Sequence, residues 1–91
     1  MTPKATMIGA LDRIQKAMES SDPFDTVYEA AYFVEHVFID DAPFEEDRIA
    51  AKAYAPQVEK LRAAFAELMK TMKFIPFAAT IEEIRTEVDA A

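Results

Sequence analysis

The chain of 91 residues has a single glycine, Gly9, and no asparagine. Tight β-hairpins depend on these two residue types, because both tolerate the positive φ that two-residue turns require. Residues that favour helices, such as alanine, glutamate, lysine, leucine and methionine, are frequent instead. We therefore expect an all-α protein, a single compact domain built as a bundle of four to five helices.

Prolines that follow a capping residue mark the expected helix starts. Thr2-Pro3 and Asp22-Pro23 each place a side-chain oxygen before a proline, and proline is well suited to the first helical position. The stretch Asp40-Asp41-Ala42-Pro43-Phe44 has the same order of cap, proline and aromatic residue. The pattern predicts a third helix that begins at Pro43.

Two further prolines and a capping box divide the second half of the chain. Pro56 and Pro76 are expected to break or end helices. Thr80-Ile81-Glu82-Glu83 fits a capping box, which predicts a short last helix. The predicted helices span residues 3–19, 23–39, 43–54, 56–74 and 81–89.

Apolar residues recur at helical spacing along most of the chain. The first helix has such a series from Met7 to Met18, in which Gly9 suggests a close helix crossing. The helix at 23–39 is apolar on nearly every side, so it is central to the core or covered by a partner. The longest series predicts a core helix and consists of Tyr54, Val58, Leu61, Phe65, Leu68, Met72 and Ile75.

The net charge of −7 is unevenly distributed. Residues 19–47 contain ten acids and no Lys or Arg, whereas residues 48–73 contain six bases against two acids. One explanation is internal, with the acidic helix at 23–39 against the basic helix at 56–74. Another is that the acidic stretch faces outward and attracts a basic partner surface. Head-to-tail self-association is the third.

Several classes of chemistry have no support in the sequence. The chain has no cysteine and no glycine-rich loop, and its pI near 4.6 argues against direct nucleic-acid binding. The acidic run at 40–47 lacks the ligand order of an EF-hand, so we expect no metal and no cofactor. No secretory apolar region and no membrane span is recognisable, and the expected location is the cytoplasm.

The only histidine, His36, lies on the polar stripe of the second helix with Glu29 and Asp40. A carboxylate–imidazole pair is geometrically feasible there, and a small enzyme that uses His36 with Glu29 is the most distant hypothesis. A single histidine beside acids is more typical of a surface residue. We expect no catalytic residue.

The function that best fits these features is a small, acidic, non-catalytic protein-binding module. It would act as an inhibitor, of the immunity or anti-defence (anti-CRISPR-like) kind, that engages a basic protein surface and occupies a nucleic-acid-binding site. The alternative is a structural or assembly homo-oligomer, such as a homodimer. Exposed aromatics such as Phe24 and Tyr28 would contribute, and the predicted contact residues are Asp25, Glu29, Tyr32, His36, Asp40, Asp41, Phe44, Glu45, Glu46 and Asp47.

Overall fold

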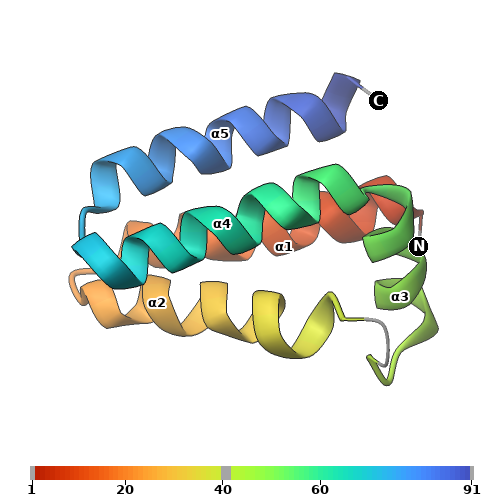
Figure 1. Cartoon of the computed structure of the whole chain (residues 1–91), viewed down its shortest axis with the longest axis horizontal. Coiled ribbons are helices and arrows are strands. Elements are labelled where there is room, and N and C mark those ends of the chain that lie inside the picture. Colours follow the sequence, from red (N-terminus) through yellow and green to blue (C-terminus); the bar gives the residue numbers. More distant parts are fainter. Residues whose placement is uncertain (1, 40–41, 91) are drawn as a thin grey trace.

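The computed structural model describes residues 2–39 and 42–90, and these residues form helices and no strand (Figure 1). The all-α prediction is confirmed. The elements in chain order are α1 (Pro3–Met18), α2 (Pro23–Tyr32), the π-helical turn η1 (Phe33–Val37), α3 (Glu45–Ala53), α4 (Ala55–Thr71) and α5 (Phe74–Ala90).

Helices α1, α2, α4 and α5 run along the length of the bundle, and the short α3 lies across one end (Figure 1). Helix α1 packs against α2, α3 and α5, while α4 packs chiefly against α5. In the predicted series of α1, Met7, Leu11 and Ile14 are fully buried and Met18 is partly buried. The predicted core residues of α5 have no exposed surface, and Leu61 and Leu68 of α4 are at most 1% exposed. The core residues without any exposed surface include Met7, Leu11, Ile14, Leu61, Ile81, Ile84 and Val88.

The first two helix starts are capped as the sequence predicts. The Thr2 side chain accepts a hydrogen bond from the Ala5 amide at 3.1 Å, and Asp22 Oδ1 accepts one from the Phe24 amide at 2.9 Å. These oxygens pair with amides that have no partner within the helix. Each cap precedes a proline, so both helices begin where the cap-proline pattern places them.

The third start is wrong by two residues, because α3 begins at Glu45 and not at Pro43. Residues 40 and 41, where the predicted cap lies, are outside the described residues. Ala42 has no side-chain oxygen to cap a helix at Pro43. Helix α3 instead begins with three consecutive acids at 45–47, which interact favourably with the positive end of the helix dipole.

The second predicted helix does not continue as an α-helix to residue 39. It changes to a π-helical turn at Phe33, where the Phe38 amide donates to the Phe33 carbonyl, five residues earlier, at 2.9 Å. The wider turn lets two consecutive pairs of apolar residues face the core. The buried residues of this turn are Phe33, Val34 and Val37, and Phe38, which follows the turn, is also buried.

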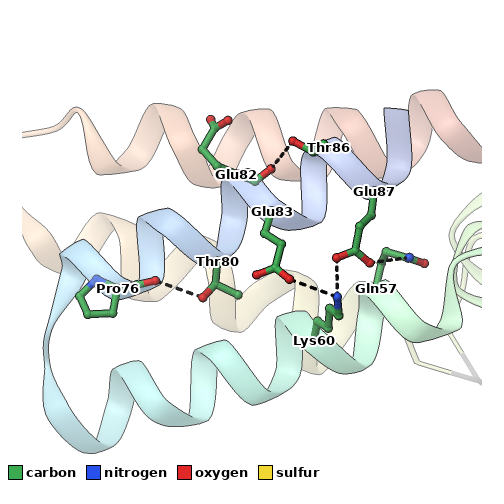
Figure 2. Close-up of polar contacts among 8 residues, drawn as sticks. All are labelled: Gln57, Lys60, Pro76, Thr80, Glu82, Glu83, Thr86 and Glu87. Atoms are coloured by element: carbon green, nitrogen blue, oxygen red, sulfur yellow. Dashed lines mark hydrogen bonds and ion pairs between the residues drawn. The ribbon is translucent and has the colours of Figure 1, made fainter. Parts of the chain in front are cut away.

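The junction between α4 and α5 also differs from the prediction. Helix α4 ends at Thr71, and Met72 then adopts the left-handed conformation with φ 54°. Pro76 does not end a helix but lies in the first turn of α5, where a missing N–H leaves no acceptor unpaired. Thr80 is therefore inside α5 rather than at its cap, and its Oγ1 donates to the Pro76 carbonyl at 3.1 Å (Figure 2).

The prediction of a close helix crossing at Gly9 is wrong. Gly9 is exposed in the middle of α1, and a Cβ atom built there would meet no atom within 4 Å. Its φ is not positive. Neither packing nor backbone conformation therefore requires glycine at this position.

We predict that Gly9→Ala raises the free energy of unfolding by about 0.5–1 kcal/mol, because glycine loses more conformational freedom than alanine when a helix forms. Chemical denaturation measures the change. The matched control is Ala66→Gly, an exposed alanine inside α4, which should lower stability by a similar amount. A decrease with Gly9→Ala would mean that Gly9 has a packing role.

Candidate functional site

Three aromatic side chains follow one another along the outer side of α2, one helical turn apart. Phe24 is 67% exposed, Tyr28 69% and Tyr32 40%. The opposite side of the same helical segment carries the buried Ala30 and Phe33. Helix α2 is therefore not surrounded by the core. One of its sides packs on the bundle, and the other side exposes aromatic side chains. We define the aromatic stripe as Phe24, Tyr28, Tyr32 and His36.

The aromatic stripe continues onto the π-helical turn. The Tyr32 ring lies 6.0 Å from the His36 ring, and it meets the buried Phe33 ring edge to face at 5.4 Å. Tyr28, Ala31, Tyr32 and His36 line a shallow hollow of about 400 Å³. Packing on Phe33 holds Tyr32 in place, so this part of the stripe is ordered by the core beneath it.

Glu29 lies in a different hollow from His36. Its carboxylate is 3.5 Å from Arg13 of α1, and the Arg13 guanidinium in turn lies over the Phe33 ring, 5.4 Å from its centre. The hollow has a volume of about 370 Å³ and includes Lys16, Asp25 and Tyr28. Glu29 therefore serves the contact between α1 and α2. The structure does not bring Glu29 and His36 together as a pair.

Three of the remaining predicted contact residues, Phe44, Glu45 and Glu46, lie just before α3 or in its first turn. Phe44 is 65% exposed before α3, and Glu45 and Glu46 are exposed in the first turn of that helix. Helix α3 lies at the end of the bundle where the segment that follows α2 ends (Figure 1). Asp40 and Asp41 fall outside the described residues.

Two other predicted acids have local roles. Asp25 accepts a hydrogen bond from the Ser20 hydroxyl at 2.6 Å, next to the start of α2. Asp47 is half-buried, and this burial raises the pKa of its carboxyl, with a smaller contribution from the neighbouring charge of Glu46. One exposed acid, Glu35 on η1, was not among the predicted residues. Its charge was the only sequence signal available for it.

The basic residues of α4 do not neutralise the carboxylates of α2. Lys60 instead pairs with Glu83 and Glu87 of α5, at 3.4 Å to Glu83, as Figure 2 shows. Arg62 pairs with Glu59 of its own helix and donates to the Phe38 carbonyl at 2.8 Å. Among the described residues at 19–47, the acid with an ion pair is Glu29, and its partner belongs to α1. The acidic segment thus keeps most of its charge.

Residues 2–39 and 42–90 give no indication of a metal site or of a membrane span. They contain no group of three or more His, Asp or Glu side chains arranged to hold a metal ion. The helices of these ranges are all too short or too polar to cross a membrane. The features that stand out are the aromatic stripe and the acids beside it.

Comparison of the chain with protein-family models, with curated proteins and with solved structures finds no match.

The contact between α4 and α5 should make the stability of the fold depend on pH. The hydrogen bond from Lys60, then that from Gln57, lowers the pKa of Glu87 below its ordinary 4.5 (Figure 2). Stability from this carboxylate is present above the unfolded-state pKa and is lost as the pH falls through the lower folded-state pKa. Glu87→Gln should therefore lower the melting temperature at pH 7 but not at pH 2.

The control is Glu67→Gln on α4, which also removes one exposed negative charge. It should lower the melting temperature at pH 7 by less than Glu87→Gln does. Equal losses for Glu87→Gln at both pH values would contradict the assignment.

Proposed function

We propose that this protein is a non-catalytic protein-binding module that captures a basic partner through the aromatic stripe and the neighbouring acids. The carrying observation is the exposure of Tyr28 and Tyr32 on a helix whose other side is packed in the core. Aromatic side chains offer large contact areas at little conformational cost and are enriched among the residues that dominate binding. Because they are exposed and follow one another along the helix, they form an apolar surface of the kind that marks protein-interaction sites.

The charges beside the aromatic stripe support a basic partner. Glu35 on η1 and Glu45 and Glu46 on α3 are exposed, and α3 lies at the end of the bundle where η1 ends (Figure 1). The segment 19–47 has no lysine or arginine to oppose them. Complementary charge accelerates encounter with a basic surface and disfavours acidic ones.

The finer form of the proposal is an inhibitor that occupies the nucleic-acid-binding surface of its partner, as an immunity or anti-defence protein would. Such a surface is rich in lysine and arginine because it contacts phosphates. Exposed carboxylates together with a series of exposed aromatic rings offer it both of the groups that nucleic acid offers, negative charge and flat rings. An assembly adaptor with a basic partner would use the same residues.

The first test removes the rings. The partner is captured from a host extract, identified by mass spectrometry and titrated with the purified protein. Tyr28→Ala with Tyr32→Ala should weaken binding by about 2 kcal/mol or more, which is about 30-fold in Kd. The control pair Met69→Ala with Ile75→Ala, also exposed but on α4 and α5, should bind as the wild type does. Unchanged binding without the tyrosines would exclude the aromatic stripe.

The second test reverses the acids. Glu45→Lys with Glu46→Lys should abolish capture in low salt, while the helix-dipole cost at the start of α3 is at most about 1 kcal/mol for each residue. Glu67→Lys with Asp89→Lys, two exposed acids on α4 and α5, matches the change in net charge. Equal loss of binding in both variants would show that only the net charge matters, not this surface.

A further inference from the structure

A second uncovered surface lies at the opposite end of the bundle from α3. The turn between α1 and α2 and the turn between α4 and α5 lie together there (Figure 1). Between them is a hollow of about 400 Å³, lined from both turns by Met18, Ser20, Ser21, Thr26, Phe74, Ile75 and Ala78. We call this surface the turn end. It does not include Tyr28, Tyr32 or His36.

An apolar projection stands at the rim of this hollow. Ile75 is 87% exposed, the highest value among the exposed large apolar side chains, and Met72 beside it is 44% exposed. Met72 is also the one non-glycine residue with positive φ among the described residues. A left-handed methionine costs on the order of 1–2 kcal/mol, so the turn that presents Ile75 is held against a backbone preference.

The charges of the turn end are also divided. The α1–α2 turn carries Glu19 and Asp22, whereas Lys70 and Lys73 lie at the α4–α5 turn. Neither lysine has an ion pair within the described part of the chain. The turn end therefore has the exposed Ile75 next to a hollow, and it has acidic residues on one turn and lysines on the other.

We propose that the turn end is a self-association surface, on which a second copy of this chain docks end to end about a two-fold axis. In such an arrangement every contact occurs twice, so a surface that carries both halves of each contact is complementary to itself. Ile75 of each copy enters the hollow of the other, and the acidic turn of each copy faces the lysines of the other.

A second copy fits this surface better than a membrane or an acidic partner does. Glu19 and Asp22 would repel an anionic surface that the lysines attract. The turn end occupies one end of the bundle, whose two shorter extents are 27 and 20 Å, so the contact is a small one. Association is accordingly weak and depends on concentration.

The first experiment measures molar mass by sedimentation equilibrium from micromolar concentrations to about 1 mM, at a salt concentration where the Debye length is about 8 Å, so that the net charge of −7 is screened. The wild type should form dimers and no larger species. Ile75→Glu should raise the dimer Kd at least about 30-fold. Ile49→Glu, an isoleucine 47% exposed on α3 at the other end, should dimerise as the wild type does.

The second experiment exchanges the charges. Glu19→Lys and Lys73→Glu should each weaken the homodimer, because like charges then face each other. Mixed in equal amounts, the two variants should form a heterodimer tighter than either homodimer, since both sets of charges are complementary again. This mixing experiment distinguishes a specific two-fold contact from unspecific association, because only a specific contact restores binding in the mixture.

A wild type that stays monomeric at 1 mM, or an Ile75→Glu variant that dimerises normally, would overturn the proposal. So would an equal loss of dimer with Ile49→Glu, or a mixture that associates no better than its components. Circular dichroism of each variant checks that the fold is kept. Ile75→Glu should still capture the basic partner, so failure of this proposal and failure of the proposed function are separate results.

Discussion

The apolar packing around α1 is the interaction on which the rest of the structure depends. Three elements, α2, α3 and α5, pack against this one helix, and Met7, Leu11 and Ile14 have no exposed surface. Burial of a side chain of this size contributes roughly 1.5–3 kcal/mol. Helix α4 then closes the bundle through α5, where Lys60 and its two glutamates lie along the seam (Figure 2).

The exposure of the aromatic stripe follows from this arrangement. Helix α2 packs mainly on one neighbour, α1, so only one side of a helix that is apolar on nearly every side can be buried. The π-helical turn adds Val37 and Phe38 to the buried side but cannot turn Tyr28 and Tyr32 inward. The sequence thus contains more apolar surface than the bundle can cover. An outer aromatic surface of this kind is expected on a protein that binds another protein.

The division of charge also remains at the surface. Lys60 pairs with acids of α5, and Arg48 and Arg62 reach the carbonyls of Ala42 and Phe38, which lie on either side of residues 40 and 41. These two hydrogen bonds hold the backbone of Phe38, after η1, and of Ala42, before α3, against the arginine side chains. Among the described acids of residues 19–47, Glu35, Glu45 and Glu46 are exposed and have no ion pair with the bases of α4.

The sequence by itself determined the helical class, the caps at Thr2 and Asp22 and the core residues of α1 and α5, because these depend on local hydrogen bonding and on a 3.6-residue period. It also indicated the acidic residues and the aromatic residues of the candidate site. Tertiary structure decided which side of α2 is covered, that Met72 and Ile75 continue the heptad series but lie outside the core, and that Glu29 pairs with Arg13 rather than His36. The reason is physical: periodicity states that a residue is suited to burial, whereas burial itself depends on a neighbouring helix arriving from elsewhere in the chain.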